Sequence, residues 1–306
     1  MKKHFLSHVD KLYEFMAKAE TLSPGEINSL TTLLNQMLPL LPTDSSITSG
    51  FSLPFERLSI NERIIGANNR LKHIADVRYP PRTIAHQLGY NRASLKGQTH
   101  MYAGSMGTLC NSIEIQPEMG QLTTVSKWKM KEGKKLKLLV ICQDGDLALS
   151  NPNELLKDYN KYTSWLDQLD DNTADVIDGM YKFIARAFAR EVSPSNRQGY
   201  IVSALISDFL FSKTGTEALY YASVPNRGAE MNIVIKPDIV DDVFELVEVQ
   251  ESLCSSRIPN SNQWMFEVTG SSKDFDKEGK INWTNAIMPE GGTAHKLIEY
   301  YNIKLD

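Results

Sequence analysis

Residues 215–235 read GTEALYYASVPNRGAEMNIVI. Two runs rich in aromatic and β-branched side chains, Ala218–Ala222 and Met231–Ile235, flank a loop that includes Val224–Gly228, and another such run follows at Val243–Val249. Short apolar runs bounded by proline, asparagine and glycine are typical of β-strands joined by loops. We therefore predict three strands here, and a β-sheet built around them.

Segments on the N-terminal side of this stretch alternate between strand-like and helical patterns. Thr123–Met130 and Lys135–Cys142 have strand-like composition around a Glu-Gly turn and predict a hairpin. Residues 152–192 and 199–213 instead repeat apolar side chains at the helical period. This mixture predicts an α+β fold in which helices flank a mixed β-sheet.

The N-terminal part predicts a helical hairpin. Apolar residues recur at three- and four-residue steps over residues 4–20. A second helix is expected to begin at Ser23-Pro24-Gly25-Glu26, which supplies an N-cap serine, a proline at the first helical position and a capping-box glutamate. Turn-forming residues between Pro42 and Gly50 then end the hairpin.

These patterns predict three regions. The helical hairpin takes residues 1–45 and the main domain residues 50–250, with the helices of residues 152–192 inserted into it. Residues 251–306 form a C-terminal extension, which either completes the sheet or covers it as a lid. An extension of this kind, or the hairpin, can also mediate a homo-oligomer.

The composition excludes several classes of protein. Hydrophobic residues make up 42% of the 306 residues and charged residues 23%, which is ordinary for a folded, soluble chain. The 33 basic and 37 acidic residues give a net charge of −4, so we expect no nucleic-acid or anionic-membrane partner. The lysines between Lys127 and Lys137 are better explained as a solvated or edge-protecting strand face than as a nucleic-acid patch.

Cysteine usage and the missing motifs narrow the chemistry further. The three cysteines, Cys110, Cys142 and Cys254, argue against a disulfide framework. The sequence has no apolar signal-peptide core and no membrane-spanning apolar run, so we expect a cytoplasmic protein. There is no CxxC pair, no HExxH motif and no cluster of histidines at metal-ligand spacing, and there is no phosphate-binding GxxxxGK[ST] or GxGxxG loop. No metal cofactor is therefore expected.

Residues 79–118 read YPPRTIAHQLGYNRASLKGQTHMYAGSMGTLCNSIEIQPE. This segment resembles the RES domain family, whose pattern has a proline pair, an arginine turn, a glycine, a tyrosine on a strand, and a helix that ends in glutamate. The corresponding elements, in the family's order and at similar spacing, are Pro80-Pro81, Asn91–Ser94, Gly97, Tyr102 and Thr108–Glu114. Asn91 replaces the family's usual glycine, and Ser94 replaces its usual asparagine.

The stretch 215–235 is similar to a second block of the same family, and the two blocks together cover about residues 55–250. Ser223 then corresponds to the family's serine and Asn232 to an asparagine that follows it. An upstream family arginine corresponds best to Arg63, with Arg70 and Arg78 as alternatives.

The resemblance implies a bent, ADP-ribosyltransferase-like sheet and an enzyme that consumes NAD by phosphorolysis or hydrolysis, as a toxin or defence effector. Phosphate is then a possible co-substrate, and an antitoxin or regulatory protein is an expected partner. Two alternatives stay open. One is ADP-ribosyl transfer to a protein target. The other is a degenerate member that binds a nucleotide without catalysis.

The chemistry of NAD cleavage suggests a role for each residue. Positive charge develops on the ribose ring as the nicotinamide bond breaks, and a carboxylate stabilises it; Glu114 is the candidate. The two phosphates suit the planar donors of Arg92 and Arg63. Tyr102 can stack on the nicotinamide or ribose, and Ser223 can orient a ribose or amide group. The resemblance adds Asn232 to the binding residues. We expect Arg92, Tyr102, Glu114 and Ser223 to line one cleft.

Overall fold

The computed structural model of the chain describes residues 2–41, 46–49, 55–104, 115–141, 155–193, 195–224, 231–258 and 263–305. The chain forms two compact units. Unit 1 comprises Met1–Thr48, Arg82–His100 and Leu136–Lys236, and unit 2 comprises Ser49–Pro81, Met101–Lys135 and Pro237–Asp306. Each unit contains both helices and strands, so the predicted α+β class is confirmed. The units interleave along the sequence, and the contiguous regions 1–45, 50–250 and 251–306 stay predictions.

The predicted helical hairpin is present in unit 1. Helix α1 (Lys2–Ala17) and helix α2 (Pro24–Met37) are joined through the short 3-10 helix η1 (Ala19–Thr21), and η2 (Leu38–Leu40) follows α2. The capping box also forms. The backbone N–H of Ser23 donates to Glu26 Oε2 at 2.9 Å, and the backbone N–H of Glu26 donates to Ser23 Oγ at 3.4 Å.

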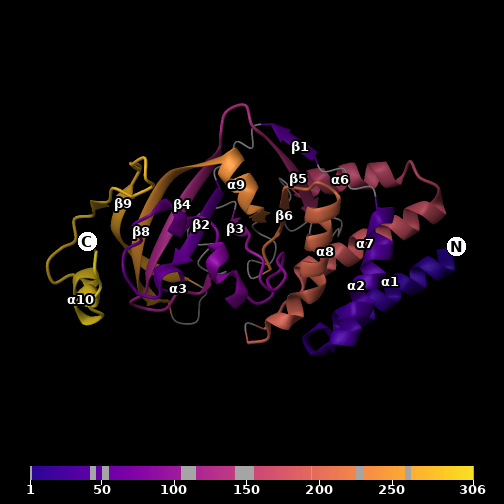
Figure 1. Cartoon of the computed structure of the whole chain (residues 1–306), viewed down its shortest axis with the longest axis horizontal. Helices are drawn as coiled ribbons and strands as arrows, with labels where there is room; N and C mark the ends of the chain where they lie inside the picture. The colour runs from indigo at the N-terminus through magenta and orange to yellow at the C-terminus, as the bar shows by residue number, and fades with distance from the viewer. Residues whose placement is uncertain are drawn as a thin grey trace. The chain divides into compact units, whose positions relative to one another are not determined.

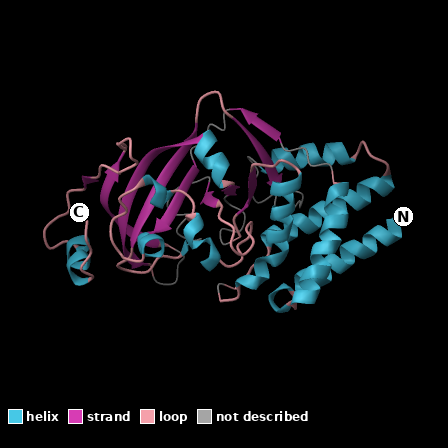
Figure 2. Cartoon of the chain, viewed as in Figure 1, coloured by secondary structure: helices cyan, strands magenta, loops and turns pink. Residues whose placement is uncertain are grey.

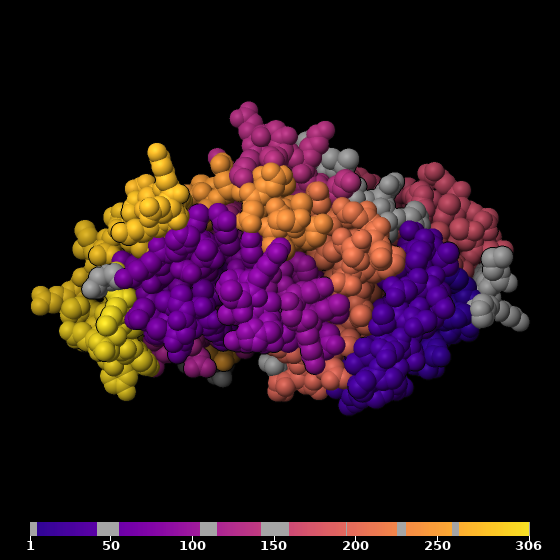
Figure 3. Space-filling view, in the orientation of Figure 1, coloured from indigo at the N-terminus to yellow at the C-terminus, as the bar shows by residue number. Residues whose placement is uncertain are grey.

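The predicted helices of the middle of the chain pack beside this hairpin. They are α6 (Leu155–Leu166), α7 (Asp171–Ala189) and α8 (Ile201–Lys213), the last preceded by η5 (Arg197–Tyr200). Helix α7 turns an apolar face toward α1, where the Phe183 and Tyr13 rings meet edge to face at 5.2 Å. The indigo surface of the hairpin lies directly against the surface of η5 and α8 in the space-filling view (Figure 3). Helix α8 is buried along most of its length.

The strands of unit 1 include both predicted strands of residues 215–235. Their order is β1 (Ser46–Ser49), β5 (Lys135–Ile141), β6 (Ala218–Ala222) and β7 (Met231–Ile235). Strands β5 and β6 are parallel, whereas β6 and β7 are antiparallel, so the sheet is mixed. Every residue of β6 is buried, which explains its continuous apolar run.

The strands of unit 2 are all antiparallel and lie side by side (Figure 2). Their order is β3 (Met101–Gly104), β2 (Phe55–Ile60), β4 (Leu122–Met130), β8 (Phe244–Arg257), β9 (Trp264–Ser272) and β10 (Thr284–Asn285). Strand β8 continues past Val249, where the sequence predicted its end. The C-terminal extension therefore contributes strands to the sheet.

The C-terminal helix α10 (Thr293–Tyr300) packs on β8 (Figure 1). Buried Leu122 and Leu253 form a small core there with Ala294 and Ile303. The remaining helices are short: α3 (Asn61–Ile65), η3 (Ile74–Val77), η4 (Arg82–Gln87) and α9 (Pro237–Val243). Within the described parts of the chain, no helix is both long enough and apolar enough to cross a membrane.

The predicted hairpin of the two strands around residue 132 is wrong, although both strands exist. Strand β4 pairs with β2 and β8, and β5 pairs with β6. The lysines of β4 therefore do not protect an open edge. Lys127 lies between Glu56 and Glu248 of the neighbouring strands, at 3.8 and 3.3 Å, and Lys129 pairs with Glu245 at 2.9 Å. Cross-strand carboxylates explain why lysines occur on this interior strand.

Candidate functional site

Arg92 is fixed at the C-terminal end of α7. Its Nη1 donates to the carbonyl oxygens of Phe188 at 2.6 Å and Arg190 at 2.9 Å. The guanidinium carbon also lies 5.0 Å from the centre of the Tyr200 ring. The last carbonyls of a helix lack intrahelical donors and carry partial negative charge, so a cation is favourable there. The half-buried guanidinium is thus oriented by the hydrogen bonds of its Nη1 and by the contact of one face with the Tyr200 ring.

The opposite edge of the same guanidinium has a different environment. Within the described residues, Nε and Nη2 of Arg92 make no hydrogen bond, whereas Nη1 uses both of its hydrogens. The Nε–Nη2 edge presents two parallel N–H donors, the geometry that binds a carboxylate or phosphate with two hydrogen bonds. Arg92 is therefore held in a manner compatible with binding an anion.

Asn232 lies on β7 and Ser223 just after β6, the strand that contacts α7. Ser223 directly follows β6 and is buried, and Asn232 lies on β7 opposite Tyr221. The Tyr221 ring is 5.0 Å from the ring of Phe188, whose carbonyl binds Arg92. A short chain of contacts inside unit 1 thus runs from Arg92 through Phe188 to Tyr221, which pairs with Asn232 and lies two residues before Ser223.

The other predicted site residues that the structure describes belong to unit 2. Tyr102 is half-buried on β3. Glu114 lies outside the described residues. Arg63 is an exposed residue of α3, and its Nη1 donates to the carbonyl oxygen of Ile115 at 3.2 Å. Arg63 thus contacts the backbone of Ile115, the residue that follows Glu114 in the sequence.

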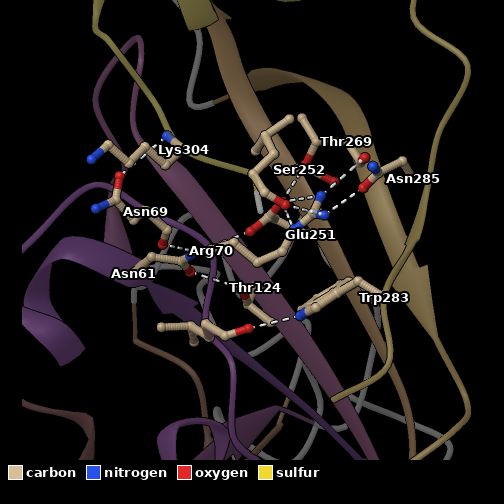
Figure 4. Close-up of polar contacts among 12 residues, drawn as sticks. Asn61, Asn69, Arg70, Thr124, Glu251, Ser252, Thr269, Trp283, Asn285 and Lys304 are labelled. Atoms are coloured by element: carbon tan, nitrogen blue, oxygen red, sulfur yellow. Dashed lines mark hydrogen bonds and ion pairs between the residues drawn. The ribbon is translucent and has the colours of Figure 1, made fainter. Parts of the chain in front are cut away.

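The two alternatives to Arg63 have other partners. Arg70 is buried, and all five of its donors are used, by Glu251, Thr269, Asn285 and Leu305 (Figure 4). Binding a phosphate would require this network to break, so Arg70 acts as a structural residue. Arg78 pairs with Asp241 at 2.9 Å. Of the three upstream arginines, Arg63 makes no ion pair with a carboxylate among the described residues, and its assignment to the substrate site stays a prediction.

The sequence analysis did not single out Arg57, which the structure makes a candidate for anion binding. Arg57 lies on β2, where its Nε donates to Ser59 Oγ at 3.1 Å, and no carboxylate of the described residues pairs with it. Burial lowers the pKa of Arg57 to about 10. A desolvated cation without an acidic partner is a common feature of anion sites. The signal available in the sequence was an arginine within the otherwise strand-like run FERLSI.

Neither a metal site nor a similarity to known proteins assigns a function to the described residues. Across the described residues, no group of three or more histidine, cysteine or acidic side chains is arranged to hold a metal ion. No protein-family model, curated protein or solved structure gives a significant match to the chain.

Proposed function

We propose that this protein consumes NAD by cleaving the bond between nicotinamide and ribose, with phosphate or water as the acceptor. The observation that supports the proposal most is the contact chain in unit 1, from Arg92 through Phe188 and Tyr221 to the neighbourhood of Ser223 and Asn232. Arg92 from one of the two sequence blocks that resemble the RES family, and Ser223 and Asn232 from the other, thus belong to the same unit. As part of the proposal, the mixed α+β architecture is a variant of the ADP-ribosyltransferase-like fold.

The proposed roles follow from the chemistry of each group. Arg92 binds a phosphate of NAD through its Nε–Nη2 edge, and Arg63 is the second arginine proposed for phosphate binding. Glu114 stabilises the positive charge that develops on the ribose. Tyr102 stacks on the nicotinamide or ribose. Hydrogen bonds from Ser223 and Asn232 orient the substrate.

The proposal extends to the setting of the reaction. An enzyme that depletes NAD harms its own cell, so we propose a cytoplasmic toxin or defence effector held in check by an antitoxin or another regulatory protein. No step of this chemistry requires a metal, and the nucleophile is phosphate or water rather than a protein side chain.

Incubating the purified protein with NAD, with and without phosphate, tests the proposal directly. ADP-ribose 1-phosphate as product supports phosphorolysis, and ADP-ribose supports hydrolysis. Labelled ADP-ribose attached to protein would instead indicate a transferase. Arg92→Ala is expected to slow product formation at low NAD, whereas Arg82→Ala, at an exposed position ten residues earlier, serves as the matched control and is expected to be neutral. Unchanged NAD with the wild-type protein under all conditions would overturn the proposed function.

A further inference from the structure

Arg92 is carried by a tight turn that is closed on itself. The backbone N–H of Asn91 donates to the carbonyl of Ser94 at 3.0 Å, and the N–H of Ser94 donates back to the carbonyl of Asn91 at 3.2 Å. Arg92 and Ala93 occupy the two central positions of this turn. The direction of the Arg92 side chain therefore depends on how the turn itself is held.

A buried hydrogen bond fastens the end of the turn. Ser94 Oγ and His100 Nδ1 are 2.7 Å apart, and the two residues are only 1% and 9% exposed. The His100 ring packs against the Phe211 ring of α8 at a centroid distance of 4.9 Å. The turn is thus attached through Ser94 and His100 to a helix in the core of unit 1.

A second attachment to α8 lies between these two residues. The backbone N–H of Leu95 donates to Gln98 Oε1 at 2.9 Å, and Gln98 Nε2 donates to Asp208 Oδ1 of α8 at 2.6 Å. Segment 94–100 is therefore held against α8, while the guanidinium of Arg92 reaches the end of α7. The position of Arg92 is defined by both helices.

We propose that Ser94 and His100 are positioning residues for Arg92: their hydrogen bond sets the turn so that the Nε–Nη2 edge of the guanidinium is presented to a diphosphate ligand. This inference rests on the proposed function. A serine paired with a histidine supplies the side-chain hydrogen bond at position 94.

Four variants separate the hydrogen bond from the packing around it. Ser94→Ala removes the hydroxyl, and Ser94→Thr keeps it. His100→Phe keeps a ring against Phe211 without a hydrogen-bonding nitrogen, and His100→Asn places an amide near the position of Nδ1. Ser207→Ala is the matched control, since it removes a buried hydroxyl that bonds only within α8 among the described residues.

The first measurement is the affinity for ADP, a nucleoside diphosphate that cannot react, determined by calorimetry. Ser94→Ala and His100→Phe are expected to weaken ADP binding about 10-fold, because a misplaced guanidinium loses part of its interaction. Ser94→Thr and His100→Asn are expected to restore most of it, and Ser207→Ala to change nothing. In an Arg92→Ala background Ser94→Ala should have no further effect, because the two changes act on one interaction. Equal losses in both backgrounds would overturn the inference.

The second measurement does not depend on NAD or ADP. The Nε–H resonance of Arg92, assigned by its absence from Arg92→Ala, reports the guanidinium directly. We expect this resonance to shift and its hydrogen exchange to accelerate in Ser94→Ala, and to stay near the wild-type position in Ser94→Thr. An unchanged resonance in a folded Ser94→Ala protein would disprove the positioning role even if the enzyme proves active on NAD. A displaced resonance in a protein that leaves NAD intact would disprove only the proposed function.

Discussion

Arg70 and Glu251 form an ion pair in the interior of unit 2, with Nη2 and Nε of the arginine 2.9 and 3.0 Å from Oε1 of the carboxylate (Figure 4). The side chains are 3% and 0% exposed. Glu251 also accepts from Thr269 Oγ1 at 2.7 Å and from Asn61 Nδ2 at 3.3 Å. The Trp283 ring lies over the guanidinium at 5.0 Å. Buried charges are tolerated when each of their hydrogen-bonding positions is satisfied, and this network meets that condition.

Removing one member of this pair is expected to destabilise the protein strongly. In Arg70→Met the Glu251 carboxylate stays buried without its cation, which typically costs about 3–5 kcal/mol of unfolding free energy. Lys129→Ala breaks the exposed Lys129–Glu245 pair of the same unit and is expected to cost under about 1 kcal/mol. Urea unfolding followed by circular dichroism measures both. Equal losses in the two variants would show that burial of the Arg70–Glu251 pair does not increase its contribution to the free energy of unfolding.

In the capping box of α2, the carboxyl group of Glu26 is expected to titrate at unusually low pH. Hydrogen bonds from the backbone and hydroxyl of Ser23 and from Lys18 lower the pKa of Glu26 from 4.5 to about 2. A lowered carboxyl pKa means that the folded state favours the ionised form. The stabilisation it provides is therefore present above pH 4.5 and is lost as the pH falls toward 2.

The side-chain carboxyl resonance of Glu26 measures this pKa directly. We expect Ser23→Ala to move the midpoint part of the way back toward 4.5, because it removes the hydroxyl that donates to the carboxylate at 2.8 Å but keeps the backbone N–H of residue 23 and Lys18 as partners. Thr32→Ala, which removes an exposed hydroxyl of the same helix, is the control and should leave the midpoint low. A wild-type midpoint near 4.5 would show that the capping box does not persist in solution.

Arg57 is expected to lower the stability of the fold while it contributes to substrate binding. Its guanidinium has no acidic partner among the described residues, and burial lowers its pKa to about 10. Replacing a desolvated, uncompensated charge by an apolar side chain of similar length removes a cost to folding. Arg57→Met is therefore expected to unfold at an equal or higher urea concentration than the wild type, and to raise the KM for NAD. A markedly less stable variant would show that Arg57 is needed for folding instead.

Local patterns identified most of the individual elements. The serine, proline and glutamate at 23–26 predicted the start of α2 to the residue, because a capping box is decided by neighbours in the chain. The buried run of β6 and the helical period of α7 were equally local. The pairing of β4 was not local. Its partners, β2 and β8, are separated from it by many residues, and a Glu-Gly turn next to β4 gave a misleading signal for a hairpin.

In the candidate site too, local features were predicted from the sequence and long-range contacts were not. The sequence singled out Arg92, but its dependence on the carbonyls of Phe188 and Arg190 follows only from how α7 ends. It left three upstream arginines as alternatives, and packing sets Arg70 apart from the other two, because Arg70 is buried and pairs with Glu251, 181 positions further along the chain. Such a pair has no signature in a single sequence. The assignments of Tyr102, Ser223 and Asn232 to substrate binding stay predictions.

The final prediction separates the roles of Glu114 and Arg92. If Glu114 acts on the charge that develops at the ribose, Glu114→Gln should keep most of the NAD affinity and lower kcat by about 10²-fold or more, the usual loss for one preorganised electrostatic group. A phosphate contact is present in both the ground state and the transition state, so Arg92→Ala should act mainly on KM. Calorimetry with NAD and an assay of nicotinamide release measure the two effects.

Thermal unfolding must accompany these measurements, since Arg92 also caps α7 and its loss can impair folding. In Arg92→Lys the charge remains but the two-donor edge is lost, so an intermediate KM is expected. Wild-type turnover in a folded Glu114→Gln protein would falsify the role of Glu114 and remove the main chemical support for NAD cleavage.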